Sequence, residues 1–488
     1  MLTHIPFPVL PAPPSWFPGH MLQFARALPG VLARTDVVLE LRDARLPLTS
    51  INRNFEGVSV LSSCTLFRIQ SGCGTVATGG MRRCGAQAQI SRPISASFRG
   101  RYTAWTLWNP LSLDSGYDGA IQKWRKERGR VATELPTDAA GPSTLALQRP
   151  APSRGLVCER IVVFNKRDLV AEWGIEPFRR AMAVKYPDQT VFFASWNRQR
   201  DIKALNDMLV GIAKSNPHIP EMNVLVVGMP NVGKSTLLNA LRTTGIPGPT
   251  SKALRTSSQP GLTRALSNRL KLSLDPPVYS YDSPGVMLPF LGNGDPGAER
   301  GVKLALIAGI KEGLYDIEAL AAYLLYRLNV LDPVSPAYLR LLPPGTSPLT
   351  DVYAFLDALA TRLCMLQRGG VPDQARAAVW LINWWRTEGG LLAAAAPAPE
   401  VGAHAHRRGW GFDLEWEVGA GQARVQDPTA VQKRMEECID RFERSAAQEE
   451  RSGGGVSATQ EKKRVREELL AKRAAKTRAR LAARRGGS

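Results

Sequence analysis

The chain has 488 residues, of which 44% are hydrophobic and 22% charged, so its composition is that of a globular protein with two or three domains. Lys and Arg number 63 against 43 Asp and Glu, and this net charge of +20 favours a polyanionic partner such as nucleic acid or an acidic membrane face. No apolar run reaches the roughly 18 residues that span a bilayer, which excludes an integral membrane segment. The six cysteines include no C-x-x-C pair, which argues against a zinc site and favours a reducing compartment.

The first segment suits two roles. Residues 1–14 contain no Lys or Arg, and Arg26 and Arg34 lie in the apolar, acid-poor stretch that follows. This stretch fits an amphipathic targeting signal, and it fits equally the first helix of a folded domain.

Short apolar runs alternate with segments of helical period over residues 15–290. The predicted strands are 37–41, 161–164, 191–194, 224–227, 270–274 and 278–281, and the predicted helices are 178–186, 202–213 and 235–241. Strands interleaved with helices predict an α/β fold, a doubly wound and mostly parallel sheet covered on both faces.

Two further regions follow. Residues 295–447 read as a second, all-helical domain, with helices at 298–312, 317–329, 351–367 and 372–386 and a loop at 393–399. Residues 448–488 read as a basic tail that is disordered or folds on binding, since 461–488 hold eleven Lys and Arg against three Glu. A merely solubilising tail is the alternative.

Residues 57–118 do not fit the α/β pattern. They contain no Lys, three of the six cysteines and no sustained period. A structureless stretch of that length inside a compact domain predicts a disordered insertion or a gene-model artefact.

A glycine-rich segment carries the clearest chemical signal. GMPNVGKS, residues 228–235, matches G-x-x-x-x-G-K-[ST] between a predicted strand and a predicted helix. Backbone N–H groups of such a loop surround phosphate oxygens. We expect Lys234 to contact the β- and γ-phosphates and to act as a catalytic residue. We expect the Ser235 hydroxyl to ligate Mg²⁺. The predicted nucleotide contacts of the loop are Asn231, Val232, Gly233, Lys234, Ser235 and Thr236.

The base is selected elsewhere. FNKRD, residues 164–168, ends a predicted strand, and the Asp168 carboxylate can accept from both N1–H and the exocyclic amine of guanine, a donor pair that adenine lacks. Asn165 can contact the base edge and the stem of Lys166 can cover the ring. Ser195, at the end of another strand, suits a second base-contacting loop.

Downstream residues suit magnesium binding and γ-phosphate sensing. Asp282, in DSPG, is positioned as the magnesium carboxylate, and the Gly285 N–H can sense the γ-phosphate. Thr263, in QPGLTR, is the candidate switch threonine for magnesium and for catalysis, with Thr256, Ser257 and Ser258 as nearby alternatives.

The order of these motifs is permuted. In ordinary small GTPases the phosphate loop comes first and the guanine-selecting motif late, whereas here NKRD precedes GMPNVGKS, QPGLTR and DSPG. The chain resembles the circularly permuted ribosome-assembly GTPases, most closely the mitochondrial ribosome-associated GTPase 1 family, which is related to the bacterial GTPase that matures the large subunit. WFPGHM (16–21) and DVVLELRDARLPLTSINRNF (36–55) also carry this resemblance. The insertion after Glu56, and Ser283 where the family usually has Thr, depart from it.

The resemblance implies a function. It predicts a GTPase that binds the mitochondrial large ribosomal subunit and its rRNA and supports maturation and translation, with GTP or GDP controlling docking and release. It also implies that the helical domain, residues 295–447, binds RNA or the ribosome. It places the protein in the mitochondrion, on the matrix side with peripheral inner-membrane association; a cytoplasmic location is the alternative. A nucleotide-gated RNA- or membrane-associated module with little hydrolysis also stays open.

The position that orients the attacking water in many GTPases carries an apolar residue in this chain. Val286 follows the DSPG glycine at the position where many GTPases carry a Gln that orients water, and Val cannot hydrogen-bond. The resemblance implies that His20 substitutes from the N-terminal segment. Asn231 is the residue type that helps hold K⁺ beside the phosphates in similar GTPases.

Overall fold

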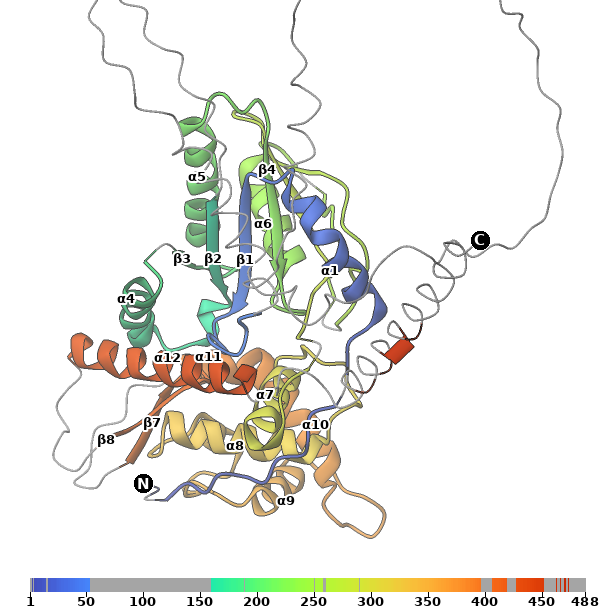
Figure 1. Cartoon of the computed structure of the whole chain (residues 1–488). Coiled ribbons are helices and arrows are strands. Elements are labelled where there is room, and N and C mark those ends of the chain that lie inside the picture. Colours follow the sequence, from blue (N-terminus) through green and yellow to red (C-terminus); the bar gives the residue numbers. More distant parts are fainter. Residues whose placement is uncertain are drawn as a thin grey trace, which may run out of the picture.

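The computed structural model describes residues 2, 4–52, 159–395, 406–418 and 427–451, apart from single positions at 15, 188, 250, 258, 259 and 289, with a few isolated residues beyond 460. The predicted insertion at 57–118 and most of the predicted basic tail lie outside this part of the chain. Figure 1 shows an α/β layer carrying β1, β2 and β4, with a set of helices including α8, α9 and α10 beneath it.

A six-stranded sheet forms the centre of the α/β layer. Its order is β3-β2-β1-β4-β6-β5, with all neighbours parallel except β5 and β6. The strands are β1 (Val37–Asp43), β2 (Glu159–Asn165), β3 (Thr190–Phe193), β4 (Met222–Gly228), β5 (Leu270–Ser273) and β6 (Val278–Asp282). The six predicted strands and the mostly parallel doubly wound sheet are confirmed.

Helices cover both faces of the sheet, because alternate strand residues point to opposite sides. Leu39 and Val226 pack with α5 (Gln199–Ser215) and α6 (Lys234–Gly245). The other face divides between α1 (Gly19–Leu32), which packs on Val38 and Val227, and α4 (Ile175–Lys185), which packs on Val162 and Phe164. The N-terminal stretch with two predicted roles therefore forms a helix of the domain.

The helical region, residues 294–395, follows β6 after one short connection. It contains α7 (Gly294–Leu306), α8 (Ile317–Leu331), α9 (Val352–Arg362), α10 (Gln374–Trp384), a π-helical turn (Trp385–Gly389) and α11 (Gly390–Ala395). Two predicted helices are too long. The left-handed φ of Ala308 (57°) ends α7 before residue 312, and that of Cys364 (54°) ends α9 before residue 367. The loop predicted from residue 393 starts later, since α11 runs to Ala395.

A β-hairpin inside the region predicted as all-helical corrects that prediction. β7 (His406–Trp410) and β8 (Leu414–Val418) pair antiparallel, and α12 (Pro428–Arg451) follows them. Figure 1 shows α12 running between α4 and the hairpin. Trp410 is fully buried, stacks on Phe178 at 5.2 Å between ring centroids, and donates from Nε1 to the Ala171 carbonyl at 2.8 Å. The hairpin is thus part of the core around α4.

Replacing Trp410 by Ala is expected to lower the free energy of unfolding by about 3–5 kcal/mol, because a large buried ring is lost and a cavity remains. The backbone of Gly174 packs directly on the ring, since a Cβ there would lie 2.1 Å from Cδ1 of Trp410. Chemical denaturation measures the loss, with Trp196→Ala as control, since Trp196 is 55% exposed. A loss below about 1 kcal/mol would show that the hairpin is not part of the core.

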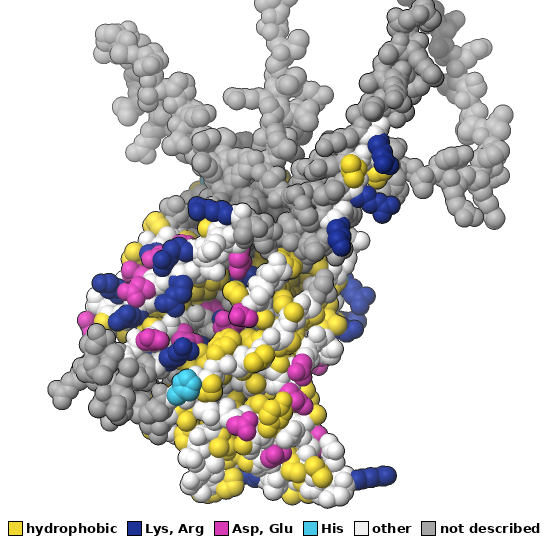
Figure 2. All heavy atoms as spheres, turned by 60° about the horizontal axis from the view of Figure 1, so that its bottom comes forward, with side chains coloured by type: hydrophobic (Ala, Val, Ile, Leu, Met, Phe, Trp, Pro, Cys, Tyr) yellow, Lys and Arg dark blue, Asp and Glu magenta, His cyan; other side chains and the backbone are white. Residues whose placement is uncertain are grey.

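The region predicted to bind RNA is not basic. Residues 295–447 hold sixteen Lys and Arg against nineteen Asp and Glu. Figure 2 looks onto the lower face of Figure 1 and shows mainly hydrophobic and uncharged side chains among the described residues there, without a continuous blue patch. Attraction to a polyanion therefore has to come from other segments. Among the described residues, no helix combines the length and apolarity that crossing a membrane requires.

Candidate functional site

A cavity of about 470 Å³ lies where the ends of β2 and β4 meet the helical region. It follows the rule that open α/β sheets bind ligands at the carboxyl ends of their strands. The cavity brings together the two predicted recognition loops and the predicted switch. Its lining includes Asn165, Lys166, Asp168, Asn231, Gly233, Lys234, Ser235, Thr236, Thr263 and Gly285.

The phosphate loop connects β4 to α6 as the motif predicts. Lys234 is buried and donates from Nζ to the carbonyls of Gly228 (3.2 Å) and Met229 (2.8 Å). Burial lowers the pKa of Lys234 to about 8, with Asp282 opposing the shift. Gly233 has a φ of +93°, and a Cβ there would lie 2.5 Å from Nδ2 of Asn165, so only glycine fits.

The guanine-selecting loop is joined directly to the phosphate loop. Asn165 donates from Nδ2 to the carbonyl of Val232 at 2.8 Å, and Lys166 donates from Nζ to the carbonyl of Asn231 at 2.8 Å. Lys166 also pairs with buried Asp43 at 3.0 Å. Two loops that are more than sixty residues apart in sequence are thus hydrogen-bonded to each other.

The Asp168 carboxylate is held by the loop after β3. The Ser195 hydroxyl donates to its Oδ1, and Nδ2 of Asn197 lies 3.3 Å from its Oδ2. Ser195 is buried and lies behind Asp168, so it orients the carboxylate. Asn197 was not predicted; it lines the cavity beside the exposed Trp196.

Two of the three predicted magnesium residues, Ser235 at the start of α6 and Asp282 at the end of β6, are in direct contact. The Ser235 hydroxyl donates to Oδ2 of Asp282 at 2.5 Å, while Oδ1 of Asp282 is buried and meets no hydrogen-bond partner among the described residues. Burial raises the pKa of Asp282, and Lys234 and Ser235 oppose this. A carboxylate with a spare buried oxygen beside a hydroxyl fits a hard divalent cation such as Mg²⁺. Thr263 lines the same cavity.

Val286 takes no part in the cavity. Its N–H donates to the carbonyl of Gly228 at 3.2 Å, and its side chain is buried against α1. The preceding Gly285 lies so close to the phosphate loop that a Cβ there would meet Cα of Pro230 at 2.7 Å. The DSPG turn therefore touches the phosphate loop directly.

His20, at the start of α1, faces the predicted switch. A Cβ on Gly261 would lie 3.7 Å from Cε1 of His20, so the imidazole lies beside the QPGLTR segment. Nε2 is buried without a hydrogen-bond partner in the part of the chain described. Burial and the charge of Arg264 lower the pKa of His20 below 6.5, which leaves the ring neutral at pH 7.

The helical region contributes part of the cavity wall, and sequence reasoning missed these residues. Arg386, Thr387 and Leu391 line it from the π-helical turn and α11. Asn231 donates from Nδ2 to the carbonyl of Ala308 at 2.6 Å, which ties the phosphate loop to the end of α7. No local pattern marks such residues, because the contact joins segments more than seventy positions apart.

These loops, in this order along the chain and around one cavity, define a circularly permuted P-loop GTPase. Residues 223–324, about a fifth of the chain, match the family model described as 50S ribosome-binding GTPase. This match and the GTPase names of the relatives support guanine nucleotide binding and the hydrolysis of GTP to GDP and phosphate.

Relatives support the resemblance stated from the motifs. Mitochondrial GTPase 1 of Schizosaccharomyces japonicus is 28% identical over 76% of this chain and 87% of its own length. Mitochondrial ribosome-associated GTPase 1 of Mus musculus is 43% identical over 22% of this chain and 32% of its own length. Among solved structures, GNP-bound YlqF from T. maritima is similar over 77% of this chain and 95% of that one, at 14% identity and a TM-score of 0.36.

Proposed function

We propose that this protein is a GTP-hydrolysing assembly factor of the mitochondrial large ribosomal subunit, whose nucleotide state controls docking and release. The observation that carries the proposal is the single cavity lined by the guanine-selecting loop, the phosphate loop, the switch and the helical region. Relatives named mitochondrial GTPase and mitochondrial ribosome-associated GTPase support the compartment and the ribosomal partner.

In this proposal each side chain has one task. Asp168, oriented by Ser195, accepts from the guanine edge, while Asn165 and Lys166 hold that loop on the phosphate loop. Lys234 binds the phosphates, assisted by the backbone from Asn231 to Thr236. Ser235, Thr263 and Asp282 would hold Mg²⁺, which would neutralise phosphate charge. Asn231, whose Nδ2 is bound to the Ala308 carbonyl, would help hold K⁺, which would add positive charge beside the phosphates.

Hydrolysis depends on His20 in this proposal. Its neutral imidazole has a free Nε2 beside the QPGLTR segment, so it can orient a water for attack on the γ-phosphate. Closure of that segment over the γ-phosphate brings Thr263 and the water into position. Loss of the γ-phosphate releases the QPGLTR segment. The DSPG turn, which is followed closely by α7, then shifts and changes the position of that helix.

Ribosomal RNA is contacted through basic segments in this proposal. Residues 461–488 carry eleven Lys and Arg against three Glu, whereas residues 295–447 are slightly acidic. The basic tail therefore supplies the attraction to rRNA and, peripherally, to the anionic inner membrane on the matrix side. In this proposal the helical region provides the ribosome-binding surface, and its orientation changes with the bound nucleotide.

Sedimentation with isolated mitochondrial ribosomal subunits tests the proposal. The protein with a non-hydrolysable GTP analogue should pellet with the large subunit, and with GDP it should stay mostly in the supernatant. A chain lacking residues 461–488 should pellet less, and rising salt should weaken binding steeply. Equal recovery with both nucleotides, or enrichment on the small subunit, would contradict the proposal.

A further inference from the structure

Arg45, just after β1, is a buried arginine whose guanidinium uses only two of its three nitrogens in hydrogen bonds among the described residues. Its Nε and Nη2 form a fork on Asp43, at 3.0 Å to Oδ1 and 2.8 Å to Oδ2. Arg45 is 3% exposed, yet Nη1 meets no hydrogen-bond partner among the described residues. The Asp43 carboxylate also accepts hydrogen bonds from Lys166 and from the Arg45 backbone N–H, so its oxygens are satisfied without Nη1. A buried guanidinium N–H without a partner is costly, and Arg45 lines the nucleotide cavity.

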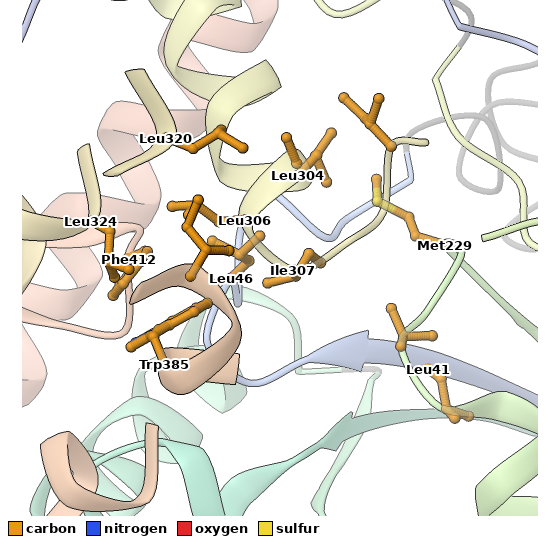
Figure 3. Close-up of a cluster of buried hydrophobic side chains, with 14 of the residues drawn as sticks. Leu41, Leu46, Met229, Leu304, Leu306, Ile307, Leu320, Leu324, Trp385 and Phe412 are labelled. Atoms are coloured by element: carbon orange, nitrogen blue, oxygen red, sulfur yellow. The ribbon is translucent and has the colours of Figure 1, made fainter. Parts of the chain in front are cut away.

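The helical region and the β7–β8 hairpin hold Arg45 in place. The guanidinium lies over the ring of Trp385 at 4.8 Å from the centroid, and Trp385 stacks on Phe412 at 4.9 Å. The Phe412 N–H also donates to the Arg45 carbonyl at 2.7 Å. Figure 3 shows Trp385 and Phe412 in the buried cluster that also contains Leu46 and Ile307. The arginine therefore belongs to the α/β domain but is positioned by side chains outside it.

A second arginine, Arg386, lies near Arg45. Burial and, to a smaller extent, the charge of Arg45 lower the pKa of Arg386, while Glu312 opposes the shift. Arg386 itself is committed to Glu312 and to the carbonyls of Ala305 and Leu306, so it braces the end of α7. The Asn231 side chain is bound to the same segment, at Ala308. Arg45 lines the same cavity as the phosphate loop, and Lys166, which shares Asp43 with it, donates to the carbonyl of Asn231 in that loop.

We propose that Arg45 donates from Nη1 to the terminal phosphate of bound GTP, and that Trp385 positions it for that contact. The proposal rests on the proposed function, since it requires guanine nucleotide in this cavity. A planar guanidinium suits phosphate oxygens, and it stabilises the charge that spreads over the terminal phosphate during transfer. Because Trp385 belongs to the helical region, a partner that moves this region also moves Arg45.

Arg45→Lys tests the contact, because Lys keeps the positive charge beside Asp43 but has no Nη1 group to donate to the phosphate. We expect the affinity for a non-hydrolysable GTP analogue to fall about 10- to 100-fold, the loss of one hydrogen bond to a charged group, while the affinity for GDP stays within about threefold. Single-turnover hydrolysis should slow by at least as much. Arg160→Lys is the matched control, since Arg160 is 2% exposed and pairs with Glu40.

Trp385 variants separate positioning from contact. Trp385→Phe keeps an aromatic face under the guanidinium and should retain the preference for the GTP analogue over GDP. Trp385→Leu removes the aromatic face and should weaken the preference for the GTP analogue over GDP, as Arg45→Lys does. Equal effects of Phe and Leu would overturn the positioning role.

The remaining outcomes are decisive as well. If Arg45→Lys leaves the ratio of GTP-analogue to GDP affinity unchanged, whether both affinities fall or neither does, Arg45 is structural and the inference is wrong. If the unmodified protein binds neither guanine nucleotide, the proposed function itself fails, and that result is visible before any variant is made.

Discussion

Asp168→Asn should lower the affinity of the protein for GTP and GDP by about 10²- to 10⁴-fold. The carboxylate is expected to accept from two guanine N–H groups, and each hydrogen bond to a charged acceptor contributes about 1.5–3 kcal/mol. Asn has the same shape but no charge, and its amide group can turn a donor toward the donors of guanine. Fluorescence titration with a labelled guanine nucleotide measures the loss.

The matched control for this variant is Asp207→Asn on the exposed side of α5. It removes the same charge at a site away from the cavity and should leave affinity within about twofold. The thermal midpoint of Asp168→Asn should stay close to that of the unmodified protein, because Asp168 is only partly buried. An affinity for GTP that survives the substitution would show that Asp168 does not read the base.

His20→Ala should slow GTP turnover about 100-fold while the affinities for GTP and GDP stay within about threefold, since a group that orients water acts only in the reaction. The lowered pKa of His20 adds a pH dependence. The ring stays neutral above pH 6.5, so its contribution is constant there and is lost as the pH falls and the ring takes up a proton. Single-turnover assays at several pH values measure both effects.

His218→Ala, at an exposed position after α5, is the control for this variant and should keep normal turnover. The same assay decides between an enzyme and a nucleotide-gated module with little hydrolysis. If His20→Ala hydrolyses GTP as fast as the unmodified protein, another group orients the water. If nucleotide affinity falls together with turnover, His20 supports the fold of the site and not the reaction.

The sheet and both recognition loops were predictable because their signals are local. Strands such as Val224–Val227 are continuous apolar runs, and the phosphate loop lies between such a strand and a helix, where its glycines are required. The inference that NKRD and GMPNVGKS meet around one ligand came from chemistry alone. The structure places Asn165 and Lys166 in hydrogen-bond contact with the carbonyls of the phosphate loop.

The contribution of the helical region to the cavity could not be predicted. Arg386 and Leu391 reach it only because α7, the π-helical turn and the phosphate loop pack together, and no pattern within one segment reports such packing. The β7–β8 hairpin did carry a signal, since Leu414, Trp416 and Val418 alternate with Glu residues after a Gly. The neighbouring Ala/Pro stretch made the whole segment resemble a loop.

Calorimetric titration of the protein with GTP, GDP and ATP in the presence of Mg²⁺ tests the central claim most directly. If one loop grips the phosphates while Asp168 reads the purine edge, both guanine nucleotides should bind and ATP should bind at least about 100-fold more weakly. ATP binding as tight as that of GTP would contradict the account.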